Sequence, residues 1–505
     1  MRLNILIGGK AGQGINKIST IVSQTLAKHG YYIFNYRDYP SVIRGGHNFN
    51  VLSVSDFPIE SHESKIDGIV AMDERTLESH KTELKKSTFV IGFEEFKDLG
   101  LNLNIALSGA LMKVLGFDKE ELLETIKKTL DNPKSLEAAE RGYASQKSLY
   151  KLLTLKNNLS ISSGSNSIVR GAINSGMDIY FGYPMTPTTN AMHELAAKQF
   201  DKNYLVFQPE NEIAVVNAAI GASFTGAKTM VGTSGGGYDL MTEALSLQGI
   251  TEIPLVVYLG MRSGPGTGMP TYTSQSDLNI ALRAGHGEFP RVVIAPGIPT
   301  EIEEKLNEAF YLSQKFNVLS ILLSDKHLAE SEFSTFAKPR RPIKIDVKRA
   351  VPGREIVRAS SYEHDEHGNS TEDASLAIKN ADARMKKYEA IRKECKKFEM
   401  IKLHGKKNSK NLIVSWGSTA GAIKDAIKDL DYKFLQVLYI KPMSDEIKKE
   451  IQRAKKVVLI ENNMTGQLGR LIREKTGIKI ERRILRYDGR PFLSDELNLQ
   501  LKKIK

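Results

Sequence analysis

Residues 178–189 of the 505-residue chain read Asp-Ile-Tyr-Phe-Gly-Tyr-Pro-Met-Thr-Pro-Thr-Thr. The apolar start predicts a buried strand, and the glycine, prolines and threonines that follow predict a loop at its carboxyl end, where open α/β sheets bind ligands. Thr186 precedes a proline and therefore favours an extended backbone, which can present its hydroxyl to a carboxylate or carbonyl. The alternative role for a threonine here is a helix N-cap, which we assign to Thr188 or Thr189.

The same alternation of strands and helices extends over residues 156–335, which we call the central unit. Strands are predicted at residues 178–181, 204–207, 227–231, 255–259, 291–295 and 318–323. Because each alternates with a segment of helical periodicity, the pattern predicts a doubly wound α/β sheet.

Two further α/β units flank the central unit. Residues 1–155, the first unit, contain apolar runs typical of a mostly parallel sheet, at 3–7, 50–54, 68–72 and 88–93. The polar stretch 157–166 and the segment 336–400 are predicted to be linkers, the second ending in a helix at 371–397. Residues 401–505, the last unit, show strand patterns at 411–414, 433–438 and 456–460. The expected fold class is therefore α/β, with three doubly wound or Rossmann-like units.

The composition narrows the function classes. The hydrophobic fraction of 41% and the charged fraction of 26% are ordinary for globular domains. The net charge of +12 is spread along the chain, so we expect no nucleic-acid partner. No stretch reads as a membrane span or signal peptide, which favours the cytoplasm. Cys395 is the only cysteine and cannot build a disulfide, a zinc site or an iron–sulfur cluster, so no metal site is expected on this chain.

Loops after successive strands of the central unit carry candidate binding residues. Glu212 lies in a predicted first helical turn, where a carboxylate suits the helix dipole and could also bond a ring nitrogen. Thr233 and Gly235 follow the next strand, and Arg262 and Thr267 follow the one after that. Arg262 has the fork geometry for a carboxylate, although a surface arginine in a mobile loop gives the same pattern. These loops are expected to meet at one edge of the sheet.

The first unit contains two glycine turns. Residues 9–14 read Gly-Lys-Ala-Gly-Gln-Gly between a strand and a helix, and Gly12 and Gly14 could expose backbone N–H groups to a phosphate. The spacing differs from the dinucleotide pattern, so a nicotinamide or flavin site is not supported. Arg44 opens the second turn, Arg-Gly-Gly-His at 44–47. Both turns could also be purely structural.

An ordered series of stretches resembles the α subunits of 2-oxoacid:ferredoxin oxidoreductases. Residues 183–189 resemble the family's Tyr-Pro-Ile-Thr-Pro loop, and similar blocks follow at 210–214, 233–237, 262–271, 275–278, 363–368, 416–419, 461–468 and 488–492. The turns of the first unit resemble the family's γ subunit, here fused ahead of the α part. Nearly the whole chain is covered. The departures are Met185 for an isoleucine, Gly236 for a proline and Gly266 for a serine.

The resemblance implies a role for each unit and candidate residue. The first unit (1–155) would be a γ-type accessory domain, the central unit (156–335) the pyrimidine-binding domain for thiamine diphosphate, 336–400 a linker with a helix, and the last unit (401–505) a transketolase C-terminal-like domain. Glu212 would be the catalytic glutamate that bonds the aminopyrimidine. The remaining roles would be substrate binding by Thr186, Arg262 and Thr267, cofactor binding by Tyr183, Pro184, Thr233 and Gly235, and coenzyme A binding or a structural turn by Gly12, Gly14 and Arg44.

The resemblance also implies partners. The chain has neither a Gly-Asp-Gly signature for Mg²⁺ and the diphosphate nor cysteines for a [4Fe-4S] cluster, so both are expected on a β subunit, in an (αβ)2 or αβ assembly. The reaction would oxidatively decarboxylate a 2-oxoacid with coenzyme A to acyl-CoA, CO2 and reduced ferredoxin. The stretches 363–366 and 489–492 favour 2-oxoglutarate over pyruvate or branched-chain 2-oxoacids. A non-catalytic assembly subunit of the same fold is the alternative from another class.

Overall fold

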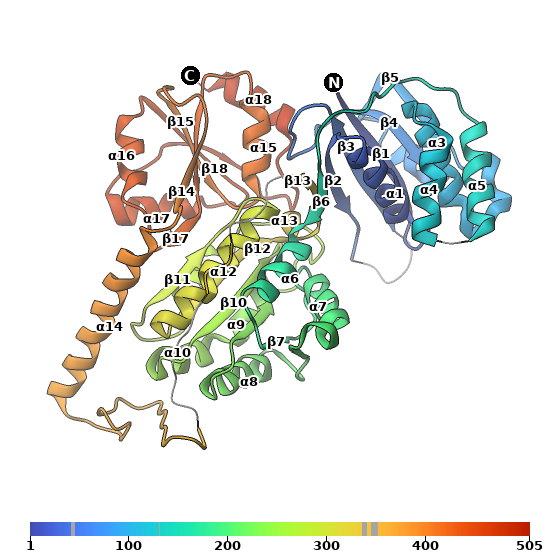
Figure 1. Ribbon diagram of the computed structural model, residues 1–505. Helices are drawn as coiled ribbons and strands as arrows, with labels where there is room; N and C mark the ends of the chain where they lie inside the picture. Colours follow the sequence, from blue (N-terminus) through green and yellow to red (C-terminus); the bar gives the residue numbers. More distant parts are fainter. Residues whose placement is uncertain (42–45, 131, 336–340, 345–351, 505) are drawn as a thin grey trace.

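The computed structural model describes residues 1–505 except 42–45, 131, 336–340, 345–351 and 505. Within the described residues the chain forms three sheets, each packed with helices, and the sheets lie side by side (Figure 1). This arrangement confirms the α/β fold class. No helix in the described part of the chain is long and apolar enough to cross a bilayer.

The first sheet has the strand order β5-β4-β1-β3-β2-β13-β6. β1 pairs parallel with β4 but antiparallel with β3, and the β3–β2, β2–β13 and β13–β6 pairings are also antiparallel. The sheet is therefore mixed, which corrects the expectation of a mostly parallel sheet. The elements of the first unit are β1 (Arg2–Lys10), α1 (Ile15–Lys28), β2 (Tyr32–Asp38), β3 (His47–Ser55), β4 (Ile66–Ala71), α2 (Glu74–Ser79), β5 (Leu84–Ile91), the 3₁₀ helix η1 (Glu94–Asn102), α3 (Leu103–Leu115), α4 (Lys119–Leu130) and α5 (Pro133–Ala144).

The segment expected to be a linker at 157–166 is structured instead. It contains β6 and the first residues of α6, where Ser163 and Asn166 form a reciprocal capping box that fixes the start of the helix. β6 is an edge strand of the first sheet, next to β13 from the far end of the central unit. The first sheet is thus completed by two strands that lie outside residues 1–155.

The central sheet has the order β17-β11-β12-β10-β9-β7-β8. All six predicted strands are present, and the pairings among them are parallel. The elements are β6 (Ser160–Ser163), α6 (Gly164–Asn174), β7 (Ile179–Gly182), α7 (Thr189–Lys202), β8 (Leu205–Phe207), α8 (Glu212–Phe224), β9 (Thr229–Thr233), α9 (Gly235–Leu240), α10 (Thr242–Thr251), β10 (Leu255–Met261), α11 (Leu278–Arg283), β11 (Arg291–Ile294), α12 (Pro299–Phe316), β12 (Leu319–Asp325), α13 (Lys326–Glu330) and β13 (Glu332–Thr335).

The last sheet has the order β14-β16-β15-β18-β19, and its three predicted strands correspond to β15, β16 and β18. One strand of this unit, β17, instead pairs antiparallel with β11 at the edge of the central sheet. The elements are α14 (Ala374–Cys395), β14 (Ile401–Gly405), β15 (Asn411–Trp416), α15 (Thr419–Ala426), β16 (Lys433–Val437), β17 (Tyr439–Lys441), α16 (Glu446–Arg453), β18 (Lys456–Glu461), α17 (Gln467–Thr476), β19 (Arg482–Leu485) and α18 (Ser494–Lys503).

The loop between β10 and α11, residues 262–277, contacts all three units. The Thr271 hydroxyl donates to the carbonyl of Tyr39 in the first unit at 2.7 Å. The side chain of Gln275 is fully buried against the last unit. Its amide donates to the Trp416 carbonyl at 2.8 Å, and its carbonyl accepts from the Asn462 backbone N–H at 2.8 Å. This junction holds the central unit against both neighbours.

Truncating Gln275 should therefore destabilise the protein. Gln275→Ala leaves the Asn462 N–H buried without its partner and the Trp416 carbonyl with only the Thr419 hydroxyl, which should lower the free energy of unfolding by roughly 1–3 kcal/mol. Urea unfolding followed by circular dichroism measures this change. The matched control is Gln452→Ala on the exposed side of α16, with an expected change within about 0.5 kcal/mol. Equal effects of the two substitutions would contradict the role of the junction.

Candidate functional site

The loops singled out in the sequence meet at the carboxyl edge of four adjacent strands, β10, β9, β7 and β8. Gly260 near the end of β10 lies under the β7–α7 loop, because a Cβ there would approach the side chains of Pro187 and Thr188 to 2.9 Å. The next loop also touches this one, since the Ser234 hydroxyl lies 3.6 Å from the Met185 sulfur. The sheet therefore brings these loops into direct contact.

Arg262 and Thr186 lie together at this edge. The Arg262 guanidinium donates to the Thr186 carbonyl at 3.2 Å, and both residues are half-buried. Burial lowers the pKa of Arg262, while the carboxylates of Asp277 and Glu212 act in the opposite direction. Within the described residues the Thr186 hydroxyl forms no hydrogen bond. A guanidinium edge and a hydroxyl thus remain available for a polar ligand.

The start of α7 differs in detail from the prediction. Thr188 stands at the N-cap position, but its side chain does not cap the helix; its hydroxyl donates back to the Met185 carbonyl at 2.9 Å. The threonine therefore fixes the shape of the loop instead of the helix end. The prediction that Thr188 or Thr189 caps the helix through its side chain is wrong.

Glu212 is the first residue of α8 and is only 6% exposed. The neighbouring Asn211 caps the helix, accepting from the Ala214 N–H at 3.0 Å, so Glu212 is free of that role. α9 closes over the carboxylate, since a Cβ at Gly237 would lie 2.7 Å from Glu212 Oε1. In the part of the chain that the structure describes, the Glu212 carboxylate has no ion pair and no hydrogen-bond donor. A nearly buried carboxylate in this state can accept a hydrogen bond from a ligand.

Two residues that pack against these loops were not among the candidates from the sequence, Asp277 and Gly237. A Cβ at Gly235 would lie 2.4 Å from Asp277 Oδ2, so this carboxyl group packs directly on the β9–α9 turn. Burial raises the pKa of Asp277 to about 6, against the hydrogen bond from Ser276 and the charge of Arg262. In the sequence, Asp277 belongs to the stretch 275–278 that resembles the family, but the resemblance implied no role for it. Gly237 could not be identified because its importance comes from close approach across two helices.

The other predicted residues lie in different surroundings. Thr233 is fully buried, with its hydroxyl 4.0 Å from the Met185 sulfur, whereas Tyr183 and Pro184 are exposed on the outer part of the β7–α7 loop. Thr267 lies at the exposed tip of the 262–277 loop and forms no hydrogen bond with the other candidate residues that the structure describes. The loop turns there on Gly266 and Gly268, both with positive φ. Thr267 is therefore not brought to the Thr186–Arg262 pair.

A cavity of about 440 Å³ joins the glycine turn of the first unit to this region. Gly12 and Gly14 line it on the side of the first unit, and Asn190 in the first turn of α7 lines it on the side of the central unit. The rest of the lining is Ile15, Asn16, Arg37, Asp38, Tyr39, Asn48, Asn50 and Glu330. Gly14 has a structural reason to be glycine: its φ is +89°, and a Cβ there would lie 2.0 Å from the Asn104 amide nitrogen. A side chain at Gly12, with φ of +88°, would meet open space. Arg44 lies outside the described residues.

The apolar side chains around the Glu212 edge are unusually exposed. Tyr183 is 39% exposed, Phe207 50%, Ile213 50% and Met269 39%. They lie in or next to the loops at the carboxyl ends of β7, β8 and β10. Exposed large apolar residues gathered around a polar site are typical of a surface that another chain covers. Among the described residues no group of three or more His, Cys, Asp and Glu side chains could hold a metal ion.

Comparisons with known proteins identify the relatives of this chain. A family model described as the thiamine-diphosphate-binding part of pyruvate flavodoxin/ferredoxin oxidoreductase matches residues 170–407, and a second, for pyruvate ferredoxin/flavodoxin oxidoreductase, matches residues 4–145. The 2-oxoacid:ferredoxin oxidoreductase subunit alpha of Sulfolobus sp is 29% identical over 100% of this chain and 97% of its own length. The 2-oxoglutarate synthase subunit KorA of Archaeoglobus fulgidus is 33% identical over 60% of this chain and 88% of its own length.

A solved structure shows the same fold. The 2-oxoglutarate:ferredoxin oxidoreductase from Magnetococcus marinus, with 2-oxoglutarate, coenzyme A and succinyl-CoA bound, has a TM-score of 0.89 and 24% sequence identity. The similarity covers 99% of this chain and 99% of that chain. The three-sheet arrangement is therefore shared over the full length.

Neutralising Asp277 should stabilise the protein in a pH-dependent way. Its pKa is about 6 in the folded state, above the ordinary value of 3.8. The ionised carboxylate is therefore less stable in the folded protein than in the unfolded chain, and it lowers the free energy of unfolding above about pH 6. Asp277→Asn should raise the free energy of unfolding by about 2–3 kcal/mol at pH 7.5 and by little at pH 3.5, where both states are protonated. Urea unfolding at the two pH values measures the difference, with Asp382→Asn on exposed α14 as control. An equal increase in the free energy of unfolding at both pH values would show that the raised pKa of Asp277 is not its cause.

Proposed function

The chain belongs to the 2-oxoacid:ferredoxin oxidoreductases, as an α subunit with a γ-like part ahead of it, and from this premise we propose that it oxidatively decarboxylates 2-oxoglutarate with coenzyme A. The products would be succinyl-CoA, CO2 and reduced ferredoxin. The observation that supports a catalytic role most directly is Glu212, a nearly buried carboxylate without a partner among the described residues.

The site fits thiamine diphosphate in the residues that this chain supplies. Glu212 offers an acceptor for a ring N–H, and Gly235 and Gly237 give α9 the close backbone approach that a side chain would prevent. When bound, thiamine diphosphate supplies a carbanion that attacks the 2-oxo carbon. The role of Glu212 is to hold or accept a proton at a ring nitrogen, and the role of the two glycines is to keep the carboxylate shielded from water.

Arg262 and Thr186 suit the substrate end of the site. The guanidinium is a permanent cation held at the Thr186 carbonyl, and with the free Thr186 hydroxyl it can bind a 2-oxoacid carboxylate and carbonyl. 2-Oxoglutarate is proposed as the substrate because 2-oxoglutarate synthase subunits from Archaeoglobus fulgidus and Methanocaldococcus jannaschii are 33% and 30% identical to this chain. Pyruvate and branched-chain 2-oxoacids are the competing substrates.

The site needs a partner subunit to be complete. This chain supplies one cysteine, Cys395, which is buried and has its pKa raised by burial to about 12, so it is no cluster ligand. The exposed apolar rim of Tyr183, Phe207, Ile213 and Met269 surrounds the Glu212 edge. We therefore propose that a β subunit packs against this rim and carries the Mg²⁺, the diphosphate contacts and the [4Fe-4S] cluster, with ferredoxin as the acceptor of its electrons.

The cavity of about 440 Å³ is proposed as the coenzyme A site. It reaches from the Gly12 turn to Asn190, and α7 begins at the loop that carries Thr186. The open space at Gly12 leaves its backbone accessible to a phosphate, and the lining also contains Arg37, which is paired with Glu332 at 2.5 Å. This arrangement would direct a thiol toward the substrate end of the site.

Replacing Glu212 should abolish turnover. Glu212→Gln keeps the size of the side chain but removes the proton acceptor, so we expect activity to fall by about 10²- to 10⁴-fold. The assay is anaerobic, coenzyme-A-dependent viologen reduction by the complex with its β subunit, ranked over 2-oxoglutarate, pyruvate and branched-chain 2-oxoacids. The control is Glu210→Gln, two residues earlier and exposed. A cofactor-loaded complex that oxidises none of these acids would leave the non-catalytic assembly role as the better account.

A matched pair at Gly12 tests the coenzyme A site. Asp and Asn both tolerate the positive φ at this position and differ only in charge. Gly12→Asp should raise the KM for coenzyme A roughly tenfold by repulsion of its phosphates, whereas Gly12→Asn should change it by less than about threefold. The KM for the 2-oxoacid should stay constant in both variants. Equal KM values for coenzyme A in the pair would place its phosphates elsewhere.

A further inference from the structure

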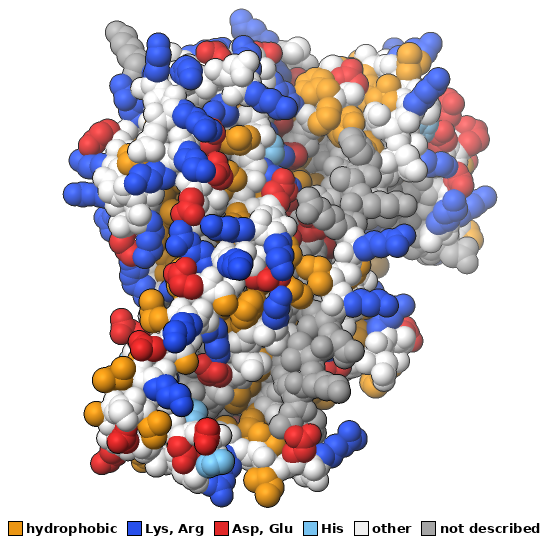
Figure 2. Space-filling model, turned by 60° about the vertical axis from the view of Figure 1, so that its left-hand side comes forward, with side chains coloured by type: hydrophobic (Ala, Val, Ile, Leu, Met, Phe, Trp, Pro, Cys, Tyr) orange, Lys and Arg blue, Asp and Glu red, His pale blue; other side chains and the backbone are white. Residues whose placement is uncertain are grey.

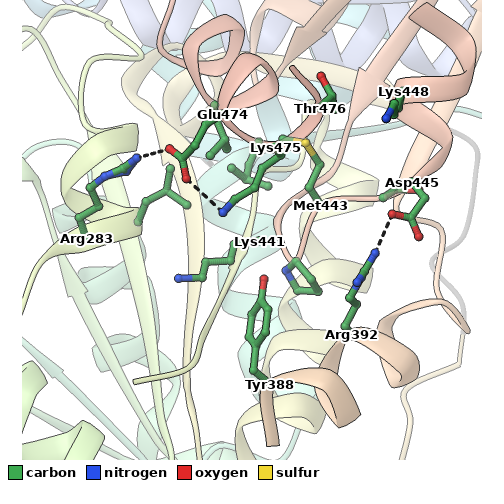
Figure 3. Close-up of a pocket in the computed structure, with 15 residues that line it drawn as sticks. Arg283, Tyr388, Arg392, Lys441, Met443, Asp445, Lys448, Glu474, Lys475 and Thr476 are labelled. Atoms are coloured by element: carbon green, nitrogen blue, oxygen red, sulfur yellow. Dashed lines mark hydrogen bonds and ion pairs between the residues drawn. The ribbon is translucent and has the colours of Figure 1, made fainter. Parts of the chain in front are cut away.

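A basic groove lies on the surface where α11, α14, β17 and α17 meet. Two cavities of about 610 and 680 Å³ adjoin there and share the lining residues Arg283, Tyr388, Lys441 and Lys475. Figure 3 shows the first of them, and Figure 2 shows lysine and arginine side chains spread over this side of the molecule. None of the residues assigned above to the 2-oxoacid, the cofactor or coenzyme A lines either cavity.

The charges along the groove are only partly balanced. Arg283 pairs with Glu474 at 2.5 Å and Arg392 with Asp445 at 2.7 Å, and Lys475 shares Glu474 at 3.0 Å. Lys441 and Lys448 also line the first cavity and have no salt bridge within the described residues. Lys441 is half-buried and lies between the Glu474 pairs and Tyr388 (Figure 3). The groove therefore holds excess positive charge at a partly dehydrated position.

Among these cations, Lys441 has a charged form that is disfavoured by its surroundings. Burial lowers its pKa to about 8, and the cations Arg291, Lys475 and Arg283 act in the same direction, opposed by Glu474. Its nearest aromatic partner is the Tyr388 ring, with the ammonium 5.8 Å from the ring centroid. A ligand anion beside Lys441 would offset both the burial and the repulsion.

The second cavity adds an apolar and aromatic surface to the cationic one. Phe289 and Met385 line it with Tyr388, and the Arg291 guanidinium lies 4.5 Å from the centroid of the Phe289 ring. Arg384, also in the lining, is already paired with Glu363 at 2.9 Å. The groove thus places Lys441, which has no salt bridge within the described residues, beside the Tyr388 ring and in the same lining as Phe289, a combination suited to a phosphate joined to a flat organic group.

We propose that this groove binds a phosphorylated small molecule of nucleotide type, with the phosphate at Lys441 and the planar group along Tyr388 and Phe289. The two adjoining cavities favour a small ligand, whereas a protein partner would need a broader surface. This proposal is independent of the catalytic site and of the coenzyme A cavity.

The test is isothermal titration calorimetry on the full chain with AMP, ribose 5-phosphate and adenosine. AMP should bind most tightly, ribose 5-phosphate more weakly, and adenosine weakest of the three. Lys441→Met should weaken AMP binding at least about tenfold at pH 7, because it removes the charged donor. The control Lys386→Met, an exposed position on α14 outside both cavities, should leave the affinity unchanged.

The pH dependence of AMP binding tests whether Lys441 is the group that binds the phosphate. A phosphate monoester is fully ionised above its second pKa of about 6, so a change between pH 7 and pH 9 reports on the protein. Because Lys441 loses its proton over this range, the affinity of the natural chain should fall by up to about tenfold. Lys441→Arg should keep the affinity at pH 7 and lose the pH dependence. Circular dichroism of each variant verifies the fold.

Four outcomes would overturn the proposal. Absence of AMP binding by the natural chain, or equal binding by Lys441→Met, would remove the site. Loss of AMP binding in Gly12→Asp with retention in Lys441→Met would assign the nucleotide to the cavity of the first unit. Loss of binding when the β subunit is added would make the groove a protein contact.

Discussion

The buried hydrogen bonds of residues 271–277 are the constraint on which the rest of the structure depends. Thr271 bonds to the first unit and Gln275 to the last, while the same loop begins with Arg262 and ends with Asp277 at the candidate site. The two bonds of the Gln275 side chain are buried and the Thr271 bond is partly buried, so breaking them takes hydrogen-bond partners from groups that water reaches poorly. The positions of the two charged residues at the site are therefore set by the packing of three units, and not by the loop sequence alone.

The contacts between units are polar and directional in other places as well. Lys326 is buried and donates to the Arg37 carbonyl at 2.5 Å, and the Tyr39 hydroxyl donates to Glu330 at 2.8 Å. On the other side, Tyr439 of β17 donates to Glu308 of α12 at 2.5 Å. Apolar packing tolerates small sliding motions, whereas such bonds fix an angle and a distance. The cavity proposed above for coenzyme A lies along one of these interfaces, and its lining includes Arg37, Tyr39 and Glu330.

Much of the fold followed from the sequence, because each strand of the central sheet is short, apolar and followed by a helix. The contact between Arg262 and Thr186 also followed, since parallel strands bring their carboxyl ends to one edge. What could not be predicted depends on approach between distant segments. The antiparallel pairing of β1 with β3, the joining of β6 and β17 to neighbouring sheets, and the packing of Gly237 on Glu212 are of this kind. Periodicity reports burial but does not identify the neighbour.

The order of strands in the first sheet has a consequence for synthesis of the chain. The outer edge of β2 is covered by β13, which begins at Glu332, and β6 reaches the sheet only through β13. At a translation rate of about 5–20 residues per second, β2 would be complete on the ribosome for roughly 15–60 s before its neighbour exists. During that interval a row of backbone donors and acceptors is open to pairing with another nascent chain. Co-translational protection of this edge, by a chaperone or by slow folding of the first unit, is thus a requirement that the strand order imposes.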